Sequence, residues 1–373
     1  MYVCYEVINS YEELSVGSAG NPQKPSINPP GESASRTKGR GNRKGVQGYV
    51  TKGDSMMKRC FTVVFAFTLI LCFKCSSVMA YDLPSVNLGL TSFLDGTPPS
   101  GPGHYFTQWV QYYGSKRLND EDGNPLLPGF ADEDLNVWVG VTQYLYLSDQ
   151  ELLFGGKWAI MGILPVVSLD LEYRTSVDGF PQDNSGGLGD IIIAPILQWD
   201  PIMGKDGPMF VQRLELQLFF PTGKYDDNRA LNPGSNFFSF NPYWAGTLFL
   251  GPRWEISTRL HYLWNDKNHD PNNGALDDSQ AGQAIHANFA FSYDLLPKRL
   301  RVGLNGYYLK QITDTEFDGA DVSGRREQIF AIGPGFLYSF SIDNHLFLNT
   351  YFETEAENRS EGKRISLRWV HHF

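Results

Sequence analysis

The sequence predicts an all-β protein: a transmembrane antiparallel β-barrel of about 12 strands, with long extracellular loops and short periplasmic turns. The first observation is strict alternation of apolar and polar residues, as in "RWEISTRLHYLWN" at 253–265. The second is the spacing of such stretches, whose connections are alternately long and short. The third is a secretion leader upstream of them. A soluble sandwich would share the alternation, but the loop asymmetry is typical of outer-membrane barrels.

The leader comprises residues 56–80. Lys58 and Arg59 give it a positive start, residues 61–73 are apolar apart from threonine, and Val78 to Ala80 supply small residues at the cleavage site. This is the pattern of a signal peptide, and its apolar run is shorter than the about 20 residues of a membrane-spanning helix. Residues 1–55 are polar and lack periodicity. We interpret them as a mis-assigned translation start, or alternatively as a disordered cytoplasmic extension.

Charge and cysteine content exclude several classes of function. Of the 31 Lys and Arg residues ten precede residue 81, and of the 41 Asp and Glu residues five do, so residues 81–373 are strongly acidic. An acidic chain is unsuited to nucleic acid, which needs a basic face. All four cysteines lie at or before position 75. The barrel region therefore has no disulfide and no thiolate metal site.

The predicted strands occupy residues 104–373 and each has 11 or more residues, enough to cross a bilayer at the usual tilt. Their even number returns both ends of the barrel to the periplasm. The long loops are polar and acidic, for example "DKNHDPNNGALDDSQ". The expected ranges are 104–115, 133–147, 157–175, 188–199, 208–220, 237–249, 253–265, 281–294, 299–312, 326–340, 345–358 and 363–373.

Residues 81–103, "YDLPSVNLGLTSFLDGTPPSGPG", precede the first barrel strand. The segment is moderately apolar and interrupted by glycine and proline, which makes it a poor membrane strand. We expect it to lie in the lumen as a plug or to line the periplasmic mouth. An additional strand is the alternative.

The last strand, "ISLRWVHHF", ends in an alternating pattern with a terminal aromatic residue. Leu367, Trp369 and Phe373 share its expected lipid-facing side. A terminal phenylalanine on such a strand resembles the signal by which the barrel-assembly machinery accepts its clients. His371 stands where an aromatic residue is common in that signal.

The alternation also predicts which charged side chains project into the lumen. Opposite charges on neighbouring strands indicate cross-strand pairs. The inward charges either stabilise and partly fill the barrel or form the wall of a selective channel, and barrel size does not decide between these interpretations. The candidates are Asp170, Glu172, Arg174, Arg213, Glu215, Arg253, Glu255, Arg259, Arg301, Glu353, Glu355, Arg364 and Arg368.

No stretch predicts catalysis, a cofactor or a metal site. "NDEDGN" begins like a calcium loop, but Pro125 stands at the glycine position and Ala131 at the position of the bidentate glutamate. His371 and His372 are adjacent on a strand and point to opposite faces. His286, Asn288 and Ser292 share a lumenal face, whereas a barrel hydrolase would need its triad at the lipid side.

Four stretches resemble the outer-membrane family associated with the meta-pathway of phenol degradation. They lie at 85–124, 186–200 ("GGLGDIIIAPILQWD"), 219–250 and 252–268 ("PRWEISTRLHYLWNDKN"). The resemblance covers essentially all of the chain after the leader. It implies an outer-membrane barrel that takes up a hydrophobic or aromatic compound.

We therefore expect an outer-membrane channel or transporter for small hydrophobic compounds, aromatic ones among them, and no enzymatic activity. The alternative is a structural or adhesive barrel with a filled lumen and no transport. Expected partners are membrane lipid and lipopolysaccharide, the barrel-assembly machinery and a small hydrophobic solute. We expect a monomer.

Overall fold

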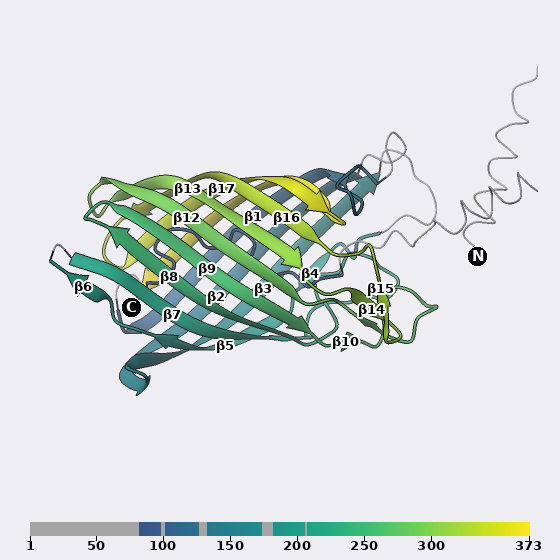
Figure 1. Ribbon diagram of the computed structural model, residues 1–373, viewed down its shortest axis with the longest axis horizontal. Helices are drawn as coiled ribbons and strands as arrows, with labels where there is room; N and C mark the ends of the chain where they lie inside the picture. Colours follow the sequence, from purple (N-terminus) through teal and green to yellow (C-terminus); the bar gives the residue numbers. More distant parts are fainter. Residues whose placement is uncertain (1–81, 98–100, 127–132, 174–181, 206) are drawn as a thin grey trace, which may run out of the picture. The chain divides into compact units, whose positions relative to one another are not determined.

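The computed structural model describes residues 82–373 except 98–100, 127–132, 174–181 and 206. The upstream extension and the signal peptide lie outside the described residues. Twelve long antiparallel strands close into a barrel in the described part (Figure 1), which confirms the predicted fold class. They are β1 (Gly103–Leu118), β2 (Glu133–Leu153), β3 (Gly156–Tyr173), β5 (Ile191–Gln198), β7 (Gly207–Phe220), β8 (Ser239–Leu250), β9 (Trp254–Asn265), β12 (Ala284–Leu296), β13 (Leu300–Gln311), β16 (Gln328–Ser339), β17 (Asn344–Glu357) and β18 (Ser360–His372).

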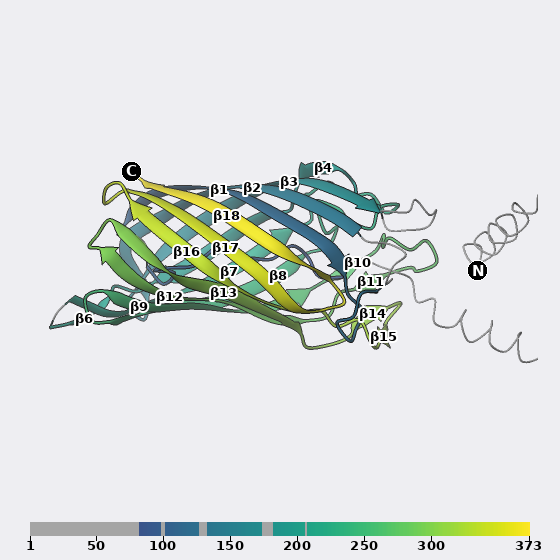
Figure 2. The ribbon, with the colours of Figure 1, turned by 90° about the horizontal axis from the view of Figure 1, so that it is seen from above.

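The barrel closes where the last strand pairs with the first. β18 lies antiparallel to β1, from Tyr105 opposite His372 to Ser115 opposite Gly362. The remaining long strands each pair with the next long strand along the chain, and Figures 1 and 2 show the barrel from two directions. Closure satisfies backbone groups that an open edge would expose to lipid.

The two ends of the barrel differ as the loop lengths predict. At the periplasmic end the β2–β3 and β12–β13 turns are tight, with positive φ at Phe154 and Gly155 (55° and 73°) and at Lys298 (62°). At the extracellular end four short strands form a separate antiparallel sheet, which the sequence did not predict (Figure 2). These strands are β10 (Lys267–Asn268), β11 (Ser279–Gln280), β14 (Thr315–Phe317) and β15 (Ala320–Val322), while β4 (Gly186–Leu188) and β6 (Ile202–Gly204) extend the main sheet.

The outer face of the barrel is apolar, as lipid contact requires. On β9, for example, Ile256 and Leu260 are exposed while Ser257 and Arg259 between them are buried. Exposed apolar side chains also stand on the outer faces of the other long strands. No helix in the described residues is long and apolar enough to cross a membrane.

Residues 82–97 run inside the barrel and form the segment here called the plug. Its start, Asp82, contacts the extracellular loop before β16, through Arg325. Close to its end, Gly96 donates a hydrogen bond to Thr247 of β8 in the periplasmic half. The plug therefore threads most of the lumen lengthwise before the chain enters β1.

Candidate functional site

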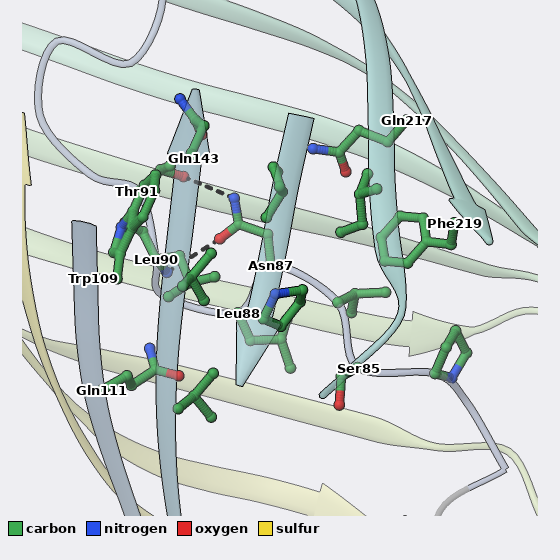
Figure 3. A pocket seen from close by; sticks show the side chains of 18 of the residues that line it. Ser85, Asn87, Leu88, Leu90, Thr91, Trp109, Gln111, Gln143, Gln217 and Phe219 are labelled. Carbon is green, nitrogen blue, oxygen red and sulfur yellow. Dashed lines mark hydrogen bonds between the residues drawn. The ribbon is translucent and has the colours of Figure 1, made fainter. Parts of the chain in front are cut away.

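A cavity of about 750 Å³ runs beside the plug. Its lining extends from Lys298 in a periplasmic turn to Asn272 in an extracellular loop, so the cavity reaches towards both ends of the barrel. Figure 3 shows Trp109 and Gln143 on one side of plug residue Asn87 and Phe219 on the other. Within the plug, Asn87 accepts a hydrogen bond from the Leu90 N–H (3.1 Å) and donates one to Thr91 (3.3 Å), which holds this part of the segment in a compact turn.

One side of the cavity is formed by the apolar arc, defined as the inner faces of β2, β3 and β5. Its wall carries almost no charge, and the outer faces of these strands also carry exposed apolar side chains, among them Ile160, Leu164 and Ile193. Strands that are apolar on both faces pack against apolar surroundings on both sides. The inner residues that line the cavity are Leu135, Val137, Val139, Val141, Leu145, Met161, Ile163, Pro165, Val167, Leu169 and Ile192, together with one polar residue, Gln143.

The other side of the lumen is the polar arc, the inner faces of β7, β8, β9, β12, β13, β16, β17 and β18. Polar side chains from these strands satisfy backbone groups of the plug. Asn288 accepts from the Gly89 N–H (2.9 Å) and donates to the Asn87 carbonyl (3.0 Å), while Ser257 accepts from the Asp95 N–H (3.2 Å). Backbone groups of an irregular segment need hydrogen-bond partners inside a membrane protein. The polar arc supplies these partners and holds the plug in place.

An ion pair anchors the plug near its periplasmic end. Arg259 of β9 donates to both carboxylate oxygens of Asp95, from Nε at 3.0 Å and from Nη2 at 2.5 Å. Both side chains are almost fully buried. Such a bidentate pair is directional, and loss of either partner leaves a buried charge.

A second anchor holds the plug at the extracellular end. Arg325 binds Asp82 through two nitrogens (2.6 and 3.0 Å), and one oxygen of Glu327 accepts from the N–H groups of Asp82 and Leu83. Burial raises the pKa of Glu327, while Arg359, at 3.2 Å, acts in the opposite direction. Glu327 and Arg359 thus clamp the start of the plug to the barrel rim.

Apolar contacts complete the seat of the plug. Leu83 and Leu88 are buried in a cluster with Leu263, Tyr307 and Tyr351. Gly96 approaches the wall so closely that a Cβ atom there would lie 2.6 Å from the Val211 carbonyl oxygen. Only glycine permits this contact, because the opposing atoms belong to the backbone.

A loop closes over the extracellular end of the apolar arc. Residues 221–238 connect β7 and β8, and Leu231 in this loop packs with Tyr113 and Leu135. Asp190 fixes the loop by accepting hydrogen bonds from the N–H groups of Gly223 (2.9 Å) and Ser235 (2.8 Å). This loop therefore covers the cavity beside the apolar arc at its extracellular end.

The structure places eight of the predicted lumenal charges on inner faces. They belong to the polar arc, where several pair with each other: Glu353 lies 3.5 Å from Arg364 and accepts a hydrogen bond from the Tyr113 hydroxyl. Glu255 accepts hydrogen bonds from two serines, one of them Ser292. The eight are Arg213, Glu215, Glu255, Arg259, Arg301, Glu353, Arg364 and Arg368.

Four predicted lumenal charges do not line the lumen. Asp170 and Glu172 are exposed on the outer face of β3, because this strand has 18 residues and its polar outer residues stand beyond the lipid band. Arg253 is exposed in a periplasmic turn, where it donates to Tyr293. Glu355 is exposed because a bulge with φ of 55° interrupts the alternation of β17. Arg174 lies outside the described residues.

Comparison with known proteins identifies the family of this chain and solved structures with a similar fold. A family model described as "Putative MetA-pathway of phenol degradation" matches residues 115–369. The chain belongs to this family. No curated protein matches. Among solved structures, the COG4313 outer membrane channel from Pseudomonas putida F1 is similar over 78% of this chain and 100% of its own, at 17% identity and a TM-score of 0.63.

Other outer-membrane barrels are similar at a coarser level. The β domain of the Bordetella autotransporter BrkA is matched over 73% of this chain and 100% of its own, at 10% identity and a TM-score of 0.41. The closed barrel of twelve long strands, with its apolar outer face, is the fold of outer-membrane proteins. The protein resides in the bacterial outer membrane.

The family member's last strand presents the predicted assembly residues outward. Leu367 and Trp369 are exposed on the outer face of β18, Arg368 between them is buried, and Phe373, which follows the strand, is exposed as well. The arrangement is the one that the alternation predicts for lipid contact.

Sequence reasoning missed the apolar arc. Because Asp170 and Glu172 were predicted to face the lumen, the apolar residues that alternate with them in "PVVSLDLEYR" (165–174) were left on the lipid side, whereas Val167 and Leu169 line the cavity. The signal that was present is the continuous apolar run of β3 and β5, "AIMGILPVV" (159–167) and "IIIAPIL" (191–197). Such runs indicate strands with apolar surroundings on both faces.

Proposed function

We propose that this protein is a channel for small hydrophobic compounds, aromatic ones among them, and that it has no enzymatic activity. The observation that supports this most is the cavity beside the plug, with the apolar arc along one wall. A porin for hydrophilic solutes has a polar, water-filled interior. An apolar wall favours solutes that lose little hydration on entering.

The solute follows the apolar arc, because the plug occupies the polar arc. Its route starts under the loop at 221–238, passes Val167 and Ile163, and ends near Met161 in the periplasmic half. The plug supplies the opposite wall through residues such as Leu90 and Phe93. The inward charges fix the plug and set the field along the route.

Lipid, lipopolysaccharide and the assembly machinery are the partners expected of a single barrel of this kind. The apolar outer face suits lipid, and the acidic extracellular loops suit lipopolysaccharide bridged by cations. We propose that Trp369 and Phe373 act in assembly and that the barrel works as a monomer.

The competing function is a structural or adhesive barrel. The plug favours it, since it fills much of the lumen through many buried contacts, Asp95 with Arg259 among them. Such a barrel would transport nothing, so transport decides between the two.

The test compares two neighbouring substitutions on opposite faces of β3. Val167→Asp places a charge in the apolar arc, whereas Ser168→Asp places one on the exposed outer face. Uptake of radiolabelled toluene is measured in intact cells that lack their own hydrophobic channels and produce either variant or wild type. A buried unpaired charge costs several kcal/mol, so V167D should lose most of the uptake that wild type adds, by about tenfold or more.

S168D should behave as wild type, and sucrose uptake should not change in any strain. Heat-dependent gel mobility checks that each barrel is folded, and Val167→Thr, which keeps the side-chain shape, gives a milder second variant. Toluene uptake that wild type does not increase would favour the structural barrel. Equal uptake by V167D and S168D would show that the apolar arc is not the route.

A further inference from the structure

Three arginines meet near the periplasmic end of the plug, but only one of them has a carboxylate partner. Arg213 and Arg259 lie in one row across β7, β8 and β9, since each stands opposite Ala245. Arg368 of β18 interacts electrostatically with both of them and with Asp95. All three line the cavity.

The nearby carboxylates are already engaged. Both oxygens of Asp95 accept from Arg259. Glu215 accepts from Gln217 at 2.8 Å and from the Tyr243 hydroxyl. The three arginines and these two carboxylates leave one positive charge in excess.

Arg213 and Arg368 are left with unused donors. Their Nε atoms are buried and have no hydrogen-bond partner among the described residues. No carboxylate oxygen in the described ranges lies within ion-pairing distance of either guanidinium. Arg368 is only 8% exposed, and its guanidinium lies 3.6 Å from the centre of the Phe347 ring. A buried guanidinium without a partner is costly, and an anion that enters the cavity would relieve that cost.

The surroundings of this pair are apolar. Phe347, which Arg368 covers, belongs to one cluster with Leu145 and Met161 of the apolar arc. Ile163 packs against the same cluster. A ligand that places an anionic head on the arginines would therefore lay an apolar body along β2 and β3.

We propose that Arg213 and Arg368 form a binding site for small amphipathic monoanions, in particular carboxylates that carry an aromatic or other compact apolar group. The inference rests on the proposed function, because it names a substrate class for the same passage. Arginine suits this role, since its planar guanidinium binds carboxylates through two parallel hydrogen bonds. The site selects by two criteria: the charge of the head and the apolar surface of the body.

The experiment titrates purified full-length protein in detergent with benzoate, benzamide and acetate at pH 7.5 by calorimetry. Benzamide keeps the ring and loses the charge, while acetate keeps the charge and loses the ring. Wild type should bind benzoate about tenfold or more tightly than either analogue, because charged hydrogen bonds and ring burial both contribute. Arg213→Gln and Arg368→Gln should each remove this preference.

Arg299→Gln is the matched control, because Arg299 is an exposed turn residue outside the cavity lining. Arg368→Lys, which retains the charge, should keep part of the benzoate affinity and guards against a folding defect in R368Q. Equal binding of benzoate and benzamide, equal binding of benzoate and acetate, or unchanged benzoate binding in R213Q and R368Q would overturn the site.

Toluene uptake separates this failure from that of the proposed function. If wild type transports toluene but does not bind benzoate, only the proposed anion site is contradicted. If wild type does not transport toluene, the proposed hydrophobic channel is contradicted, whatever the protein binds.

Discussion

The two arcs of the lumen differ in chemistry and in what covers them. The polar arc carries buried residues such as Arg259, Asn288 and Glu255, and the plug lies on it. The apolar arc carries Val139, Val167 and their neighbours, and it lines the open cavity. Most polar groups of the inner wall hold a segment of the chain in place. The route that we propose follows the arc that carries almost no charge.

Removal of the plug should have the largest effect. Deletion of residues 82–97 exposes the polar arc to water and widens the lumen to the full barrel. Single-channel conductance in planar bilayers should rise several-fold, and hydrophilic solutes such as sucrose should then enter liposomes. A deletion variant with the conductance of wild type would mean that the plug does not limit the lumen.

Loss of the buried ion pair should have the next largest effect. Asp95→Asn leaves Arg259 as a buried uncompensated charge, which costs about 3–5 kcal/mol. The plug should then detach part of the time, so that brief high-conductance openings appear in single-channel recordings. Asp149→Asn, at an exposed position of β2, is the control.

A double variant tests whether the unpaired charge causes these openings. Arg259→Gln in the D95N background removes the unpaired charge and should make the openings rarer again. Openings that are just as frequent in the double variant would show that the charge itself does not drive detachment.

A smaller effect is expected at the point of closest approach between plug and wall. Gly96→Ala brings a Cβ atom against backbone atoms of β7 and β8, which cannot move aside. Overpacking of this kind costs about 1–3 kcal/mol. Protease cleavage within residues 82–97 should become faster than in Ser85→Ala, a change at an exposed plug position. Equal cleavage rates would place the tight contact elsewhere.

The outer face of β18 should matter least for the lumen. Trp369→Ser with Phe373→Ser removes two exposed apolar side chains without touching either arc. We expect lower amounts of protein in the outer membrane and unchanged single-channel conductance in the barrels that do assemble. If the amount of folded protein in the outer membrane, measured by heat-dependent gel mobility, does not change, these residues do not act in assembly.

The barrel itself could be predicted from the sequence, because alternation, loop length and strand length all depend on local patterns. The two faces of β9 follow from its alternation alone. Asp170 and Glu172 could not be placed in this way, since alternation gives two faces but not which of them meets lipid. The error arose because β3 is apolar on its inner face as well.

Other features depend on contacts far apart in the chain. The bulge that turns Glu355 outward depends on how β17 pairs with β16. The ion pair of Asp95 with Arg259 joins residues 164 positions apart. Neither the bulge nor the ion pair can be recognised from the local sequence pattern. A segment interrupted by glycine and proline could be expected in the lumen or at its periplasmic mouth, but its position against one arc could not be predicted.

Cysteine accessibility tests most directly the claim that the plug covers one arc and leaves the other open. The four native cysteines all lie at or before position 75, so protein without the leader can carry a single introduced thiol. Val139→Cys stands on the apolar arc and Ser366→Cys on the polar arc, where Ser366 is fully buried. A small water-soluble thiol reagent should label V139C and spare S366C, and deletion of residues 82–97 should make S366C reactive. Equal labelling of both in the full chain, or an S366C that stays protected without the plug, would contradict the account.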